Sequence, residues 1–268
     1  MPIILWTDAL VFLLIACGIG SGFYIGRREY LLASWRRVGE SRAGMAALTV
    51  LAAFIVLDLL DSLHYRPRLE AVAGQPANGY SSEVRSALDA LLLPLRSGTE
   101  KTYSAPLATH LYARETVELP DGTQARVFPR LRHGGAHLQD PVEEWARDVS
   151  WKVARGLAFA VLAGLTFAAI AVQAAALRWG VGWPAAWRRI RRGETQFAWN
   201  AVLATLAVLL LLGGPVAALA GGYHVFGTDK VGQDVLYLTL KSIRTGLVIG
   251  TITTLAMLPF AVALGIVA

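Results

Sequence analysis

The chain has 268 residues, of which 55% are hydrophobic and 16% charged, and its mean hydropathy is +0.48. This balance excludes an ordinary soluble domain and is typical of a membrane protein. The net charge of +6 does not indicate a nucleic-acid partner, because the arginines cluster beside apolar runs and form no solvated basic stripe. The single cysteine, Cys17, lies inside an apolar run, so an internal disulfide is excluded.

Five apolar runs are long enough to cross a bilayer, whose hydrocarbon core of about 30 Å needs roughly 20 helical residues. They cover residues 3–26, 43–60, 156–177, 197–221 and 245–268. Asp58 and Asp61 share one helix face at the end of the second run, where they indicate either an exit into water or a polar contact between spans. The sequence therefore predicts an all-α polytopic membrane protein with about five transmembrane helices and a small external α+β domain between spans two and three.

The distribution of arginine predicts how the chain is oriented. The loops at residues 27–42 and 178–194 are rich in arginine and should face the cytoplasm of a bacterial inner membrane. The N-terminus, residues 61–155 and residues 222–244 are then periplasmic. The predicted regions are an N-terminal transmembrane hairpin at 1–60, a periplasmic cap at 61–155, a third span with a basic loop at 156–195 and a last region at 196–268.

Two local elements are expected inside the predicted cap. Residues 82–96 carry a valine and four leucines on one helical stripe, with Ser82 as the N-cap and Pro94 as a kink or end. Residues 113–128 alternate in polarity on both sides of a Pro-Asp-Gly-Thr turn, which predicts a small β-hairpin.

A polar segment before the third span holds the side chains that come nearest to a metal or catalytic pattern. His133, His137 and Asp140 are of metal-binding types, but two glycines between the histidines disfavour a helix, so polar loop histidines are the other interpretation. Asp140 also precedes a proline and two glutamates, which predicts a helix start that continues into the third span. With no nucleophile or phosphate-binding motif in the chain, we expect no enzymatic activity, metal or cofactor.

The stretch from residue 222 to residue 250 carries the most specific pattern. Its letters HVFGTDKVGQDVLYLTLKSIRTGL resemble the segment between the first two core spans of the inner-membrane permeases of oligopeptide, dipeptide and nickel ABC importers. Nine positions match that family in order: His224, Phe226, Gly227, Thr228, Asp229, Gly232, Asp234, Val235 and Arg244. The departures are Val225 for a proline, Gln233 for an arginine and Lys241-Ser242 for a Tyr-Gly pair. Gln233 cannot supply the charge of the usual salt bridge.

The resemblance covers residues 198–268 and implies a transport subunit whose substrates are peptides. It implies a partner permease subunit, two ATP-binding subunits that hydrolyse ATP and a periplasmic substrate-binding protein. Membrane lipid would surround the spans. The earlier spans and the cap would be an N-terminal extension, and we expect a fragment, because the family continues with further spans. The alternative is a membrane-anchored sensor or assembly protein whose periplasmic domain binds a ligand or partner.

Physical chemistry suggests how the matched positions work. Gly227 would allow a tight bend, and Thr228 or Asp229 could cap a short amphipathic helix over residues 232–241. That helix would lie at the external mouth of the spans, as a gate or as a docking face for the binding protein. The alternative is a rigid surface helix that only fixes the loop.

A charge pair is also expected in this segment. Asp234 could bind Lys230 or Arg244 near the membrane surface.

Overall fold

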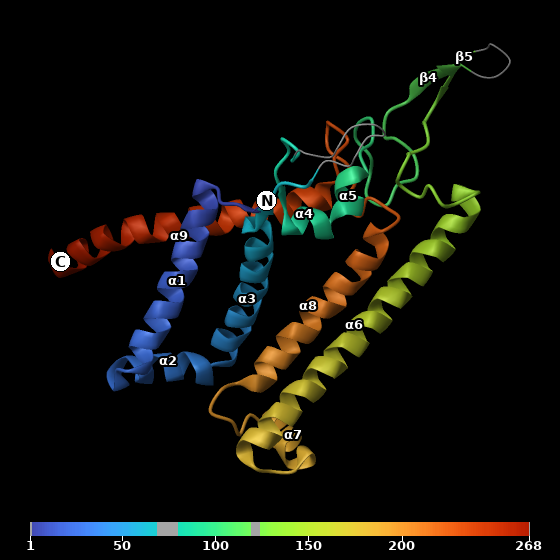
Figure 1. Ribbon diagram of the computed structural model, residues 1–268. Coiled ribbons are helices and arrows are strands. Elements are labelled where there is room, and N and C mark those ends of the chain that lie inside the picture. Colours follow the sequence, from blue (N-terminus) through green and yellow to red (C-terminus); the bar gives the residue numbers. More distant parts are fainter. Residues whose placement is uncertain (1, 69–79, 119–123, 268) are drawn as a thin grey trace. The chain divides into compact units, whose positions relative to one another are not determined.

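The computed structural model describes residues 2–68, 80–118 and 124–267, and most of them are helical (Figure 1). Within these residues, five helices are long and apolar enough to cross a membrane. They are α1 (Trp6–Gly26), α3 (Arg42–Ser62), α6 (Pro141–Trp179), α8 (Trp199–Ala220) and α9 (Val235–Val267). The prediction of a mainly helical chain with five candidate membrane spans is confirmed.

The remaining elements are short. The helices are α2 (Glu29–Glu40), α4 (Ala87–Leu91), α5 (Leu93–Ser97) and α7 (Trp183–Arg192). An antiparallel sheet contains β1 (Pro2–Ile3), β2 (His64–Tyr65) and β3 (Arg85–Ser86). The predicted hairpin forms from β4 (Glu115–Glu118) and β5 (Gln124–Val127), while its predicted turn at residues 120–123 lies outside the described residues.

The helix predicted over residues 82–96 is wrong in its start and its length. Because β3 holds the chain extended up to Ser86, the helix begins only at Ala87. Ser86 replaces Ser82 as the N-cap: its Oγ accepts a hydrogen bond from the Asp89 amide at 3.0 Å, and the Asp89 carboxylate accepts one from the Ser86 amide at 2.9 Å. This reciprocal capping box satisfies two amides at the helix start. The helix was predicted to kink or end at Pro94, but the break falls at Leu92, and Pro94 lies in the first turn of α5.

The helix predicted to begin after Asp140 is present and is the longest in the chain. One carboxylate oxygen of Asp140 accepts hydrogen bonds from the amides of Val142 and Glu143 at 2.9 and 3.4 Å, and Pro141 occupies the first turn. The helix runs without interruption for 39 residues to Trp179, where Gly180 ends it with a φ of 64°. At about 1.5 Å per residue it is about 58 Å long, well beyond a hydrocarbon core of about 30 Å.

The contacts divide the chain into two compact units. The first contains Met1–Tyr24, Ala53–Leu93 and Tyr237–Ala268, and the second contains Ile25–Ala52 and Pro94–Leu236. The division falls between Leu93 and Pro94, inside the segment predicted to form one cap. The candidate sites below each lie within a single unit.

In the second unit, α6 and α8 lie side by side and α7 follows the end of α6 (Figure 1). Glycines set their closest approach, since a Cβ on Gly156 would lie 2.6 Å from the carbonyl oxygen of Gly214, and one on Gly214 would lie 2.6 Å from that of Gly156. The two backbones therefore touch without an intervening side chain, as small residues permit in membrane helix pairs.

Candidate functional site

The loop that carries the family resemblance, residues 222–234, is called the motif loop below, and two of its glycines have conformations that other residues rarely adopt. Gly227 has a φ of 77° and Gly232 a φ of 79°. A Cβ at Gly227 would lie 2.3 Å from the carbonyl oxygen of Ser104, and one at Gly232 would lie 1.9 Å from that of Glu100. Because the obstacles are backbone atoms, both positions require glycine for conformation and for space.

Asp229 and Thr228 fix the loop by different bonds from the helix caps predicted for them. Asp229 Oδ1 accepts hydrogen bonds from the amides two and four residues later, at 2.9 and 2.8 Å. Thr228 Oγ1 donates to the carbonyl of Thr102 at 2.8 Å. The chain then stays extended at Asp234, which forms an isolated antiparallel β-bridge with Thr228.

The separate short helix predicted at residues 232–241 is therefore wrong. The positive φ of Gly232 and the extended conformation of Asp234 delay the helix until Val235. From Val235 one continuous helix, α9, runs to Val267.

His224 lies at the centre of the motif loop, between two carboxylates. Its Nδ1 is 2.7 Å from Asp234 Oδ2, and its Nε2 is 3.4 Å from Glu100 Oε1; all three side chains are buried. Glu100 also accepts hydrogen bonds from three successive backbone amides, at residues 132–134. In place of the predicted Lys230 or Arg244, the structure brings His224 to Asp234.

The surroundings shift the pKa values of His224 and Glu100. Burial opposes the charged imidazole, but the hydrogen bond and charge of Asp234, followed by those of Glu100, outweigh it and raise the pKa of His224 above 6.5. Burial also opposes the ionised form of Glu100, but the three amides and His224 outweigh it and hold the pKa of this carboxyl below 4.5. The arrangement therefore favours an imidazolium between carboxylates.

These shifts predict a pH optimum for the stability of the motif loop. A raised pKa in the folded state makes the His224 contribution complete below about 6.5 and lost as the pH rises through the folded value. The lowered pKa of Glu100 makes its contribution complete above about 4.5 and lost as the pH falls. Hydrogen exchange of residues 222–236, corrected for intrinsic rates, should be slowest between these limits and faster above the folded-state pKa of His224.

The His224→Gln variant is the control for this pH dependence. It keeps a hydrogen-bonding side chain but has no charge to lose, so the loosening on the alkaline side should disappear. Equal alkaline loosening in the variant and the native chain would show that another group is responsible.

The two histidines considered as metal ligands have separate surroundings. His137 Nε2 lies 2.8 Å from Asp148 Oδ2, which also accepts from Lys152 at 2.6 Å and from the Tyr223 hydroxyl at 2.7 Å. His133 binds Glu100 through its backbone amide. Within the described ranges, no group of three His, Cys, Asp or Glu side chains is arranged to hold a metal ion. His137 thus forms a polar cluster with Tyr223 and with Asp148 and Lys152 of α6.

A second charged group lies in the first unit, along one stripe of α9. Lys241 Nζ is 2.7 Å from Asp61 Oδ1 and 3.1 Å from Asp89 Oδ1. The Tyr237 hydroxyl donates to Asp89 at 2.7 Å. Asp61 is buried and makes a polar contact between α3 and α9, which was one of its two predicted roles.

Arg244 continues the same stripe of α9. It is one of the nine positions that match the permease family, and it belongs to this charged group. Its guanidinium donates to Asp8 and Thr7 of α1 and lies 4.0 Å from Asp61. Asp8 is fully buried and is also 2.9 Å from His64 Nδ1. Arg244 therefore joins α9 to α1, where the sequence had predicted a bond to Asp234.

The surroundings of Asp89 favour its ionised form. Burial opposes its charge, but the amide of Ser86, the Tyr237 hydroxyl and Lys241 outweigh burial and lower the pKa of Asp89 to about 2. Asp89 is therefore ionised under physiological conditions, and Lys241 neutralises charge supplied by both α3 and α4.

Several partners in these two sites were not predicted. Glu100 and Ser104 support the motif loop, while Asp8 and Lys241 build the charged group. Acidic and basic residues near the ends of apolar runs were the available indication for Asp8 and Lys241, because such charges pair in membranes. Nothing in the local sequence marks Glu100.

The motif loop is the feature that can be compared most directly with the family resemblance. Of the matched residues, His224, Thr228 and Asp234 are buried, and Phe226 is 48% exposed. No protein-family model, curated protein or solved structure matches the chain.

Proposed function

We propose that the chain is a permease subunit of a peptide-type ABC importer, and that the motif loop belongs to its external gate or docking face. The observation that carries the proposal is that the positions matching the family are those on which the loop conformation depends. Gly227 and Gly232 cannot carry a Cβ without a clash, and His224 with Asp234 forms the buried centre. The resemblance therefore falls on positions that the loop conformation uses, and this supports the proposal.

The connection between the motif loop and α9 suits a gate. The Val235 amide donates to the carbonyl of Gly227 at 3.1 Å, so the first residue of α9 is bonded directly to the loop. Binding of an external protein to the loop would then act on the start of a candidate membrane helix without a flexible linker. The exposed ring of Phe226 offers an apolar contact for such a partner.

The arginine-rich helices support the proposed orientation. The four arginines of α7 are exposed, and α2 carries exposed arginines at positions 36 and 37. By the positive-inside rule these helices would face the cytoplasm and the motif loop the periplasm. In this proposal, ATP is hydrolysed by two separate subunits, and a second permease subunit completes the path.

The proposal is tested by purification of the complex from native membranes. An affinity-tagged full chain, extracted in mild detergent, should retain a second multi-span protein and ATP-hydrolysing subunits. After reconstitution in liposomes, the ATPase rate should rise when a peptide-loaded binding protein is added. A complex without ATPase subunits would contradict the proposal and favour the membrane-anchored sensor.

The docking role of Phe226 has its own test in the reconstituted complex. Phe226→Ala should reduce stimulation by the binding protein about five- to tenfold, a loss of the size expected when an aromatic contact is removed. The exposed neighbour Val231, which is 71% exposed, provides the matched control Val231→Ala with little expected effect. Equal stimulation of both variants and the native complex would remove Phe226 from the docking face.

A further inference from the structure

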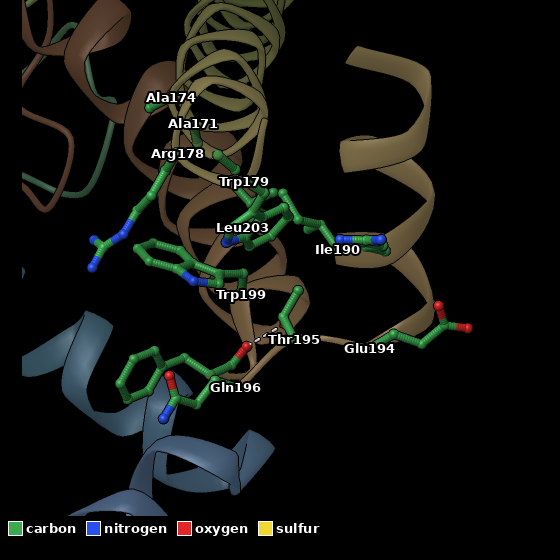
Figure 2. A pocket seen from close by; sticks show the side chains of 13 residues that line it. Ala171, Ala174, Arg178, Trp179, Ile190, Glu194, Thr195, Gln196, Trp199 and Leu203 are labelled. Atoms are coloured by element: carbon green, nitrogen blue, oxygen red, sulfur yellow. Dashed lines mark hydrogen bonds between the residues drawn. The ribbon is translucent and has the colours of Figure 1, made fainter. Parts of the chain in front are cut away.

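A pocket of about 470 Å³ lies in the second unit, where α6, α7 and α8 meet (Figure 2). This volume is within the range of small-molecule sites. Side chains from the last turns of α6 and the first turns of α8 line it, together with the end of α7 and the following loop. The residues used in the argument are Ala171, Ala174, Ala175, Arg178, Arg189 and Trp199.

The pocket combines an apolar wall with unpaired positive charge. Ala171, Ala174 and Ala175 leave a shallow groove along α6 because their side chains are small. Arg178 and Arg189 are exposed, and neither has an ion-pair partner among the described residues. A carboxylate also lines the pocket, that of Glu194, and it lies 3.7 Å from Arg192.

The position of the pocket along the helices is that of a membrane boundary. Arg178 is in the last turn of α6, and α8 begins at Trp199, so both apolar helices change to polar sequence here. Trp179 and Trp199 line the opening with Arg178 (Figure 2), and indole rings favour this depth of the bilayer.

Packing holds α7 beside the pocket. Its buried residues Ala186 and Ile190 form one apolar cluster with Val172 and Ala176 of α6. Arg189 is adjacent to Ile190 in the sequence and lines the pocket. Packing of Ile190 in the apolar cluster therefore also fixes the turn of α7 that carries Arg189.

We propose that this pocket binds an anionic phospholipid, with the phosphate held by the exposed arginines that line the pocket, Arg178 and Arg189, and an acyl chain along the alanine groove. Guanidinium groups bind phosphate oxygens with bidentate geometry, and basic pockets between membrane helices at the bilayer surface are suited to anionic headgroups. The groove favours a lipid over a free phosphate, because a free ion leaves its apolar wall uncovered. The site is independent of the transporter proposal.

Native mass spectrometry of the purified full chain tests the site with phosphatidylglycerol as the probe. The native chain should retain one phosphatidylglycerol more tightly than phosphatidylcholine. At about fivefold in affinity for each arginine near the membrane surface, the variant Arg178→Gln/Arg189→Gln should bind about 25-fold more weakly. The matched control Arg188→Gln/Arg191→Gln removes two α7 arginines that do not line the pocket and should change the affinity less than twofold.

The acyl groove is tested without changing charge. Ala174→Phe fills the groove and should weaken phosphatidylglycerol binding at least fivefold, while Ala169→Phe, on an exposed position of α6 outside the pocket, should not. Inorganic phosphate at millimolar concentration should not displace the lipid. Equal effects of the pocket and control variants, or displacement of the lipid by phosphate alone, would overturn the proposal. If Ala174→Phe changes the thermal unfolding followed by circular dichroism, Ala171→Phe takes its place as the variant that fills the groove.

Discussion

Arg244→Met should lower the stability of the first unit by about 3–5 kcal/mol, the cost of leaving one partner of a buried ion pair unpaired. The substitution keeps a long apolar side chain and removes the guanidinium that binds Asp8 and Thr7. Asp8 is fully buried, so its carboxylate would keep the Leu5 amide and His64 as partners but would lose its arginine. Unfolding by sodium dodecyl sulfate in mixed micelles, followed by circular dichroism, measures the loss.

A double substitution separates the ion pair from simple loss of packing. Arg244→Met combined with Asp8→Asn removes both charges and should recover at least half of the lost stability. Arg155→Met removes an exposed arginine and should stay within about 0.5 kcal/mol of the native chain. A double variant as unstable as Arg244→Met alone would show that the contact acts through volume and not through charge.

Gly232→Ala should disrupt the motif loop, with a local destabilisation of at least about 2 kcal/mol from backbone strain and steric overlap. The new Cβ would lie 1.9 Å from the carbonyl oxygen of Glu100, in a backbone with a φ of 79°. Relief requires the loop to move away from Glu100, which would also loosen His224. Hydrogen exchange should therefore accelerate together at residues 98–104 and 222–236.

Gly246→Ala is the matched control for this substitution. A Cβ there would meet no atom within 4 Å, and the residue lies in the interior of α9, where alanine is favoured over glycine by roughly 0.5–1 kcal/mol. This variant should leave exchange of the motif loop unchanged. If Gly232→Ala behaved in the same way, the loop would not depend on the conformation that only glycine adopts readily.

The elements that depend on local pattern were predictable. The five helices that could span a membrane follow from the length of their apolar runs, and the start of α6 follows from Asp140 and Pro141. The β4–β5 hairpin follows from alternation around a turn. Each of these signals is contained within a few turns of chain, so no distant contact is needed to read it.

The interactions that build the two sites depend on distant residues and were not predictable in the same way. His224 and Glu100 are 124 positions apart, and Arg244 and Asp8 are 236 apart, so spacing along the chain carries no information about either pair. The error at residues 232–241 has a similar origin. Its amphipathic pattern was real, but Gly232 takes its positive φ where the loop meets the backbone of Glu100.

The uninterrupted length of α6 constrains how the second unit can move. About 19 of its 39 residues exceed what the hydrocarbon core needs at about 1.5 Å per residue. The helix also carries Asp148 and Lys152, which bond His137, and Asp148 accepts a hydrogen bond from Tyr223 of the motif loop. The second unit thus contains one long helix without a break. If the half that could cross a membrane changes its tilt, the other half must tilt with it.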